Sequence, residues 1–435
     1  MKYTENALNI LTTKTFKGIG DAWINKHLTK PLSFEIIVQL LQKDSKCKDN
    51  VDEDIFLKIR RNLESILTSK LENHCDGITA IGDDNFPKYR GNVKESERPN
   101  VLFYRGDLNL LSDENKNIAV IGVLNPDKST EADERKIVHY LVQKNAVIVS
   151  GLALGCDTIA HDETVKSNGV TVAILPSPLN KIIPRENKKL ADDIVANGGL
   201  LITEYYEQPK SAQENAGRFV KRDRLQALFS DAVLLSASYN IDSKDPNSPQ
   251  IDSGSKHALE KAKEYGLQQA VIYNNKYAHN PKYDLNRFII QDNKSAIILN
   301  PDNFFKELDT LFYSQNTQSI FQEIQYEGST DDLFSLNPPE DSSNLFYLES
   351  TTNGVIITKN KKSFPIKTGD VINNGVKIIL EYCLNQQCYT ATIQNNIGFI
   401  KCFSDKEKQE YILAIKIDIL NNEEDKKKFL KFFHP

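Results

Sequence analysis

A glycine-bearing turn after the apolar run 146–149 offers the clearest chemistry in this chain. Ser150, Gly151 and Gly155 separate that run from a segment with the composition of a helix. Glycines let the backbone turn tightly and direct several N–H groups outward, and the start of a helix adds a partial positive charge. An anion, most simply a phosphate, is the ligand expected there. Many α/β proteins use such a turn only to change direction, so the turn alone leaves both interpretations open.

Short apolar runs alternate with helix-forming segments between residues 78 and 312. Because the runs are nearly continuous, helices are expected to cover both faces of the sheet that they form. Ligands of such sheets bind beyond the carboxyl ends of the strands, where the turns at Gly122 and at 150–157 both fall. The predicted fold class is therefore α/β, a Rossmann-like and mostly parallel sheet with helices on both faces. The expected strands are Ile118–Ile121, Ala146–Val149, Val170–Leu175, Leu200–Thr203, Ala232–Ser236 and Ala270–Tyr273.

Composition shifts along the chain predict smaller domains on either side of this sheet. Apolar residues at helical spacing predict a helical module at the start, and its turn at 15–20 resembles that of a helix-hairpin-helix. Such a turn can hold a DNA phosphate or simply connect two helices. Near the other end, Asn353-Gly354 between alternating runs indicates a β-hairpin, and a closing helix is expected at 424–433. The predicted segments are a helical (SAM or helix-hairpin-helix-like) domain at 1–77, the Rossmann-like domain at 78–312, a polar linker at 313–344 and a β-rich domain at 345–435.

Composition also restricts the class of protein. The chain has 435 residues and a net charge of −5, so any contact with nucleic acid must come from a local basic patch. Its six cysteines show neither zinc-site nor disulfide-framework spacing, which fits a reducing cytoplasm, and no metal or cofactor is expected. No apolar run approaches the ~20 residues that span a bilayer, and the N-terminus lacks the hydrophobic region of a signal peptide.

Motifs in a fixed order between residues 78 and 308 resemble those of the DNA-processing protein A (Smf) family, the single-stranded-DNA-binding members of a wider Smf/LOG superfamily. About half of the chain is covered. The matching segments are Ile78 to Asp83, Pro99 to Asp107, Ile118 to Gly122, Ser150 to His161, Thr171 to Leu175, Pro184 to Asn187, Gly199 to Tyr205, Arg218 to Arg224, Asp252 to Ser255 and Asn286 to Ile289.

The resemblance implies a groove for single-stranded DNA along the cationic run 218–224. Guanidinium groups bind phosphate in a bidentate manner and stack on bases, although a solvated charged face has the same composition. Arg185, followed by Lys188 and Lys189, could add phosphate contacts or simply face solvent at a helix start. The predicted phosphate-binding residues are Gly122, Ser150, Gly151, Gly155, Arg185, Arg218, Lys221, Arg222, Arg224, Ser253 and Gly254.

Four positions depart from the resembled family. Val123 and Leu124 stand where it has a serine and an arginine, Leu154 replaces a further arginine, and Asp223 replaces an asparagine. Fewer cations and one more carboxylate should reduce a phosphate-driven affinity and its dependence on salt. The rim of the sheet either binds DNA less tightly or is adapted to another ligand.

Acid and base candidates are few. Asp157 and His161 lie four residues apart on one expected helix, but with no nucleophile or metal partner a structural role is expected, with Asp157 capping backbone N–H groups and His161 packed below. Glu204 follows a strand and could be the base of a nucleotide N-glycosidase, as in related members of the superfamily. The glycine pair typical of those enzymes is absent from Ser253 to Glu260, so catalysis is the less favoured interpretation.

Two functions follow from these patterns. The first is a cytoplasmic protein that binds single-stranded DNA in processing, recombination or uptake, or in defence against foreign DNA. The resemblance implies a RecA-type recombinase as partner, a homodimer is possible, and no membrane is involved. The second is a sensor of a nucleotide or nucleotide-derived signal, or a nucleotide N-glycosidase. The cationic run favours the first function, because a mononucleotide needs fewer charges.

Overall fold

The computed structural model describes residues 1–246, 248 and 254–312 and the backbone of six later strands. The chain divides into two compact units, residues 1–323 and 324–435. The predicted linker at 313–344 lies outside the described residues, and the division of the chain into the four predicted segments stays a prediction. Among the described helices, none combines the length and the apolar character needed to cross a membrane.

In the described part of the first unit, ten strands form one sheet in the order β1-β2-β3-β7-β6-β5-β4-β8-β9-β10. The strands from β7 to β10 in this order are all parallel, whereas β3 pairs antiparallel with β7 and with β2. The predicted mostly parallel sheet is confirmed. The bounds are β1 Lys2–Tyr3, β2 Gly77–Ala80, β3 Val101–Gly106, β4 Asn117–Ile121, β5 Val147–Ser150, β6 Thr171–Leu175, β7 Leu200–Thr203, β8 Ala232–Leu235, β9 Gln268–Ile272 and β10 Ile297–Leu299.

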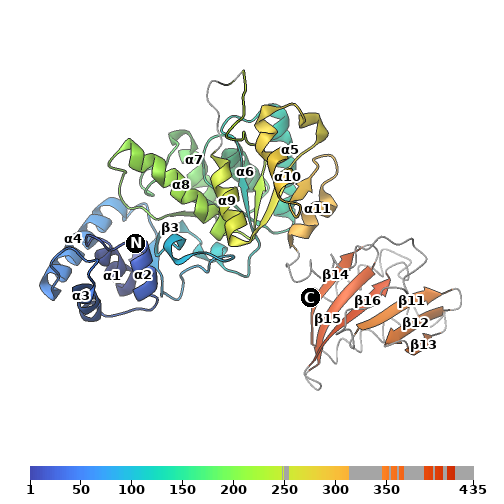
Figure 1. Ribbon diagram of the computed structural model, residues 1–435, viewed down its shortest axis with the longest axis horizontal. Helices are drawn as coiled ribbons and strands as arrows, with labels where there is room; N and C mark the ends of the chain where they lie inside the picture. The colour runs from blue at the N-terminus through green and yellow to red at the C-terminus, as the bar shows by residue number, and fades with distance from the viewer. Residues whose placement is uncertain are drawn as a thin grey trace. The chain divides into compact units, whose positions relative to one another are not determined.

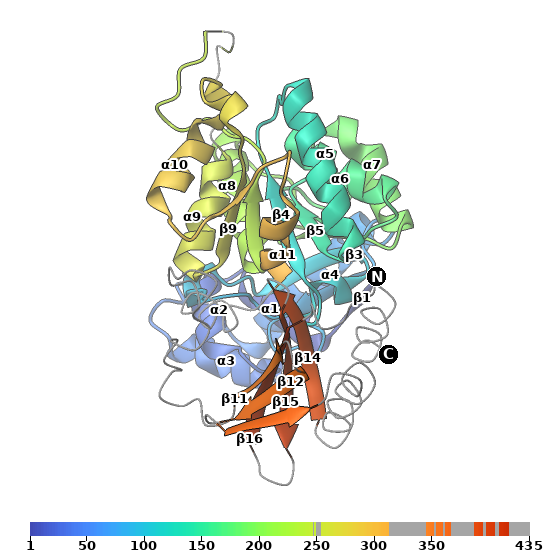
Figure 2. The same cartoon turned by 90° about the vertical axis from the view of Figure 1, so that its right-hand side faces the viewer.

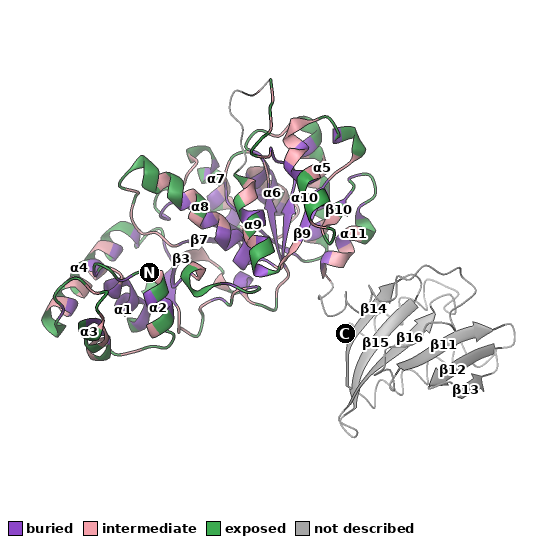
Figure 3. Ribbon diagram, in the orientation of Figure 1, coloured by how far each residue is buried: buried purple, intermediate pink, exposed green. Residues whose placement is uncertain are grey.

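Helices cover both faces of the parallel strands (Figures 1 and 2). The apolar sides of α5, α6 and α11 form one buried cluster with the sheet, and those of α8, α9 and α10 form another on the opposite face. Because both faces are covered, strands β4 to β8 are buried throughout their length, whereas Ile298 of the edge strand β10 is exposed (Figure 3). The bounds are α5 Lys128–Gln143, α6 Cys156–Lys166, α7 Lys188–Ala196, α8 Ala212–Leu228, α9 Ser255–Tyr265, α10 Asp284–Asp292 and α11 Phe305–Asp309.

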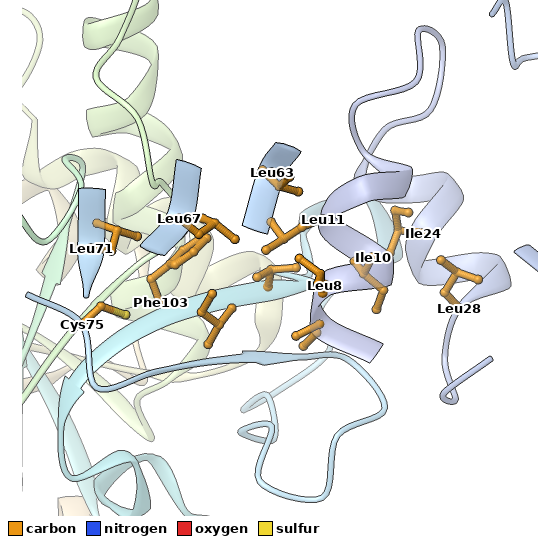
Figure 4. Close-up of a cluster of buried hydrophobic side chains, with 14 of the residues drawn as sticks. Leu8, Ile10, Leu11, Ile24, Leu28, Leu63, Leu67, Leu71, Cys75 and Phe103 are labelled. Atoms are coloured by element: carbon orange, nitrogen blue, oxygen red, sulfur yellow. The ribbon is translucent and has the colours of Figure 1, made fainter. Parts of the chain in front are cut away.

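Four helices lie between β1 and β2 in the chain and pack against β2 and β3 within the same unit. Leu67 and Leu71 of the longest one lie beside Phe103 of β3 in a continuous buried cluster (Figure 4). The turn expected to resemble a helix-hairpin-helix has its Lys17 N–H bonded to the Asp49 carboxylate at 2.6 Å, so a carboxylate of the chain already occupies that donor. The bounds are α1 Glu5–Thr13, α2 Asp21–His27, α3 Phe34–Lys43 and α4 Glu53–Leu71.

The described strands of the second unit form a sheet in the order β13-β12-β11-β16-β15-β14. All neighbours are antiparallel except β11 and β16. The predicted hairpin at Asn353-Gly354 connects β11 and β12, while the predicted closing helix at 424–433 lies outside the described residues. The bounds are β11 Leu345–Thr351, β12 Gly354–Lys359, β13 Lys362–Ile366, β14 Gln387–Gln394, β15 Ile397–Ser404 and β16 Gln409–Lys416.

Candidate functional site

The loops after β4, β5 and β8 meet at the carboxyl edge of the parallel strands. The order of strands reverses between β4 and β8, and ligands of open α/β sheets bind beside such a switch point. The Val123 N–H donates to the Ala237 carbonyl at 2.9 Å, and the Cys156 N–H donates to the Val123 carbonyl at 3.1 Å. The Ser255 hydroxyl donates to the Gly122 carbonyl at 3.0 Å. Backbone contacts therefore fix the Gly122 turn at this edge.

The glycine turn at 150–157 carries its own anion. The Asp157 carboxylate accepts from the N–H groups of Gly151 at 3.1 Å and Ala153 at 3.2 Å, which is the capping role expected from the sequence. Gly155 adopts a φ of +74°, and a side chain there would also collide with the backbone of the Gly122 turn. The Ser150 hydroxyl donates to the Val120 carbonyl at 2.7 Å and so joins two strands. The hydrogen-bond donors of Ser150, Gly151 and Ala153 are therefore bonded to acceptors within the protein.

His161 also has a structural place, below the turn. It is fully buried, and its Nδ1 lies 2.7 Å from the Thr171 hydroxyl. That hydroxyl donates to the Ile148 carbonyl, so it accepts from a neutral imidazole protonated at Nδ1. Burial, together with nearby Arg222, lowers the pKa of His161 to about 3. An imidazole held neutral in this way cannot act as an acid near neutral pH.

The predicted cationic run lies on α8, and its most buried pair joins Arg224 to Glu204. The guanidinium makes a bidentate contact with both Glu204 oxygens, at 2.7 and 2.8 Å, and both side chains are 6% exposed. Nε of Arg224 also donates to the Glu97 carbonyl at 2.8 Å. With both oxygens occupied by Arg224, Glu204 is poorly suited to act as a catalytic base.

The other α8 cations are paired as well. Arg218 is buried, contacts Glu214 at 2.6 Å and lies over the Tyr205 ring, 4.1 Å from its centroid. Lys221 contacts Asp21 of the helical region at 2.7 Å. Burial opposes ionisation of Asp21, but Lys14 and Lys221 together hold its pKa below the ordinary value.

Arg222 completes this set from beneath the glycine turn. It is 5% exposed, its Nη1 lies 3.8 Å from Asp157 and its Nε lies 3.0 Å from Asp223. Its guanidinium also fills the space that a side chain on Gly151 would need. Phosphate binding by the four α8 cations stays a prediction, but each of them already has a carboxylate partner inside the protein.

The loop between β6 and α7 presents cations of a different kind. Lys181, Arg185 and Lys188 are exposed, and none of them forms an ion pair with a carboxylate that the structure describes. Asn187 holds this loop against the glycine turn, because its amide donates to the carbonyls of Leu152 at 2.8 Å and Ala153 at 3.2 Å. Arg185 was predicted from the sequence, and Lys188 was noted beside it. Lys181 was missed, since nothing in its local sequence marks it.

Two exposed leucines lie on the turns at the carboxyl edge of the sheet. Leu124 is 44% exposed and Leu154 is 43% exposed, and the Leu124 backbone lies against Gly155. They occupy positions where the resembled family carries arginines. Of the remaining predicted residues, Ser253 lies outside the described residues, and Gly254 is exposed at the start of α9.

Restoring a cation at this rim should strengthen binding of an anionic chain. We expect Leu154→Arg to raise the affinity for oligo-dT and to steepen its salt dependence by about 0.7 in the slope of log K against log salt, the value for one added phosphate contact to a single strand. Titration of a labelled oligonucleotide at several salt concentrations measures both quantities. The neutral Leu154→Gln separates the gain of charge from the loss of the apolar surface. An arginine variant no tighter than the glutamine variant would mean that DNA does not pass over this position.

Comparison with known proteins identifies the family. The model of the DNA recombination-mediator protein A family matches residues 77–309, more than half of the chain. Protein Smf of Borreliella burgdorferi is 28% identical over 46% of this chain and 62% of its own length. DNA processing protein DprA of Streptococcus pneumoniae is 35% identical over 30% of this chain and 45% of its own. The chain thus matches less than two thirds of the length of these curated relatives.

A solved structure supports the fold. DNA processing protein A from Streptococcus pneumoniae superimposes with a TM-score of 0.51 and 23% identity, covering 68% of this chain and 95% of that one. The protein of the same name from Helicobacter pylori, described for its single-stranded DNA binding mode, is 25% identical over 52% of this chain and 97% of its own, with a TM-score of 0.41. Because the family model matches residues 77–309, more than half of the chain, the chain belongs to the DNA recombination-mediator protein A family.

Proposed function

We propose that this protein binds single-stranded DNA and acts in DNA processing or recombination. The observation that carries the proposal is the loop between β6 and α7, where Lys181, Arg185 and Lys188 are exposed without carboxylate partners. Asn187 bonds this loop to the glycine turn at the carboxyl edge of the sheet, where ligands of this fold class bind. Unpaired cations at such an edge are available to phosphates, whereas the α8 cations are already neutralised.

The apolar side chains at the rim favour a single strand over a duplex. Leu124 and Leu154 offer exposed apolar surface on the Gly122 turn and on the glycine turn to which Asn187 fastens the loop. Unpaired bases present flat apolar faces to such surface, while in a duplex those faces are stacked inside the helix. Cations for phosphates beside apolar surface for bases are typical of proteins that bind single strands without sequence preference.

Three further parts of the proposal rest on the family resemblance. They are transfer of bound DNA to a RecA-type recombinase, formation of a homodimer, and a role in defence against foreign DNA. The competing function is recognition of a mononucleotide or nucleotide-derived signal at the same rim. A mononucleotide carries few phosphates, so it would need fewer of the cations along the loop.

The direct test is fluorescence anisotropy of a labelled ~30-mer oligo-dT with purified protein. We expect Arg185→Glu/Lys188→Glu to abolish most of the binding, because two phosphate contacts become repulsive. The charge-matched control is Lys166→Glu/Lys263→Glu at the opposite edge of the sheet. These two exposed lysines near the carboxyl ends of α6 and α9 form ion pairs with Asp162 and Asp292 that solvent screens, so their loss should cost little stability. Equal loss in both variants would indicate a non-specific charge effect.

Competition separates the two functions. Unlabelled oligo-dT should displace the probe, whereas dTMP at the same nucleotide concentration should not. No binding of the oligonucleotide by the unmodified protein at low salt would overturn the proposal, and displacement by the mononucleotide alone would favour the signal-binding function.

A further inference from the structure

A hollow of 480 Å³ lies where the helical region meets the sheet, beside the rim. Its walls come from the end of α4, from the loop after β6 and from the segment after β7. Lys70, Lys181 and Lys210 line it from these three segments, together with the ring of Tyr206. Sites for small ligands in proteins typically have volumes of ≈ 300–1,000 Å³, so a nucleotide unit fits this hollow.

The charges in the hollow favour an anion. Lys70 pairs with Glu207 at 2.8 Å, and both side chains are more than a third exposed, so solvent screens the pair. Lys181 and Lys210 are exposed and form no ion pair with any described carboxylate. The residues lining the hollow thus include three lysines and one glutamate, and the excess positive charge is available to a phosphate.

Contacts with the rest of the protein fix the walls of the hollow. The Asn180 amide donates to the Lys70 carbonyl at 3.1 Å and fastens the loop after β6 to the end of α4. Leu67 and Leu71 anchor that end of α4 against Phe103 (Figure 4). The Tyr206 ring packs on Phe103 with ring centroids 5.8 Å apart. Its position is thus set by the core, although the ring is only half-buried.

The same loop connects the hollow to the proposed DNA-binding rim. Asn180 fastens one end of the segment 180–187 to α4, and Asn187 fastens the other end to the glycine turn. Lys181 lies beside the first anchor and Arg185 lies near the second. A strand following this loop from the rim would keep its phosphates near cations until it reached the hollow.

We propose that the hollow binds one nucleotide of the single strand, with its phosphate among Lys70, Lys181 and Lys210 and its base against the Tyr206 ring. This inference rests on the proposed function and adds a defined subsite to it. An aromatic ring beside a basic groove is the arrangement by which sequence-tolerant proteins stack bases of single strands.

Two measurements on the full chain test the subsite. Oligo-dT with 5-iodo-deoxyuridine at successive positions should, on irradiation, form a cross-link that peptide mapping assigns to Tyr206. Lys70→Gln/Lys210→Gln should weaken binding of the 30-mer and reduce the slope of log K against log salt by about 0.7, the value for the one phosphate that the hollow holds. Both lysines are exposed, so the fold should tolerate the change, and Lys166→Gln/Lys263→Gln is the matched control.

The outcomes separate the subsite from the function on which it rests. If the unmodified protein does not bind oligo-dT, the proposed function fails and the subsite fails with it. If the protein binds oligo-dT, but the lysine variant keeps the full salt slope and no cross-link maps to Tyr206, the subsite alone is wrong.

Discussion

Glu204→Ala should lower the free energy of unfolding by about 3–5 kcal/mol, the usual cost of removing one partner of a buried ion pair. The Arg224 guanidinium would remain 6% exposed without the two carboxylate oxygens that it now contacts at 2.7 and 2.8 Å. Urea unfolding followed by circular dichroism measures the change. An effect of this size would show that Arg224 serves the fold, whatever else it contacts.

The control for this prediction is Glu207→Ala. Glu207 also pairs with a cation, Lys70, but both side chains of that pair are well exposed, so the expected loss is about 0–1 kcal/mol. If Glu204→Ala were as mild as this control, Arg224 would have another stabilising partner or would turn toward solvent. The pair would then no longer account for the buried charge of Arg224.

Glu134→Gln should make the protein more stable at pH 8 while leaving its stability near pH 4.5 almost unchanged. Glu134 is fully buried on α5, and burial raises its pKa from 4.5 to about 8. In the unfolded chain the same carboxyl group loses its proton near pH 4.5. The folded state therefore binds one more proton between pH 4.5 and 8, so stability falls by roughly 1 kcal/mol per pH unit as pH rises through that window.

Glutamine removes this dependence because it has no proton to lose. Unfolding free energies of both proteins at pH 5, 6.5 and 8 would show a difference that grows with pH. The opposing effect of His161, which favours unfolding below its ordinary pKa of 6.5, is present in both proteins and cancels in the comparison. Glu131→Gln, a change at a half-exposed partner of Arg135 on the same helix, is the control. Parallel pH profiles for wild type and Glu134→Gln would contradict a neutral buried Glu134.

The central sheet was predictable because each of its parallel strands is a short apolar run that can be recognised in the local sequence. The runs expected at 118–121, 200–203 and 232–236 correspond to β4, β7 and β8 within a residue at each end. Apolar residues buried on both faces of a parallel sheet leave a continuous signal in the sequence. The structural role of Asp157 could also be predicted from the sequence, since a carboxylate early in a helix caps nearby N–H groups.

The pairing of the cations could not be predicted in the same way. Lys221 and Asp21 lie 200 residues apart in the chain, and the loop after β7 and most of α8 separate Glu204 from Arg224. A charged run in the sequence looks the same whether its partners are phosphates or distant carboxylates. Lys181 is the opposite case, a cation with no carboxylate partner among the described residues. Its place in the proposed site depends on the contacts of Asn180 and Asn187 that fix its loop. Only the folded chain distinguishes neutralised cations from available ones.

The most direct test of the account is the salt dependence of oligo-dT binding by the unmodified protein. Arg185 and Lys188 are each available to one phosphate, and the lysines of the adjoining hollow share a third. At about 0.7 per phosphate contact, these three contacts predict a slope of log K against log salt of about −2. A slope near this value would support binding through the loop and the hollow. A slope near zero, or no binding at low salt, would contradict the account.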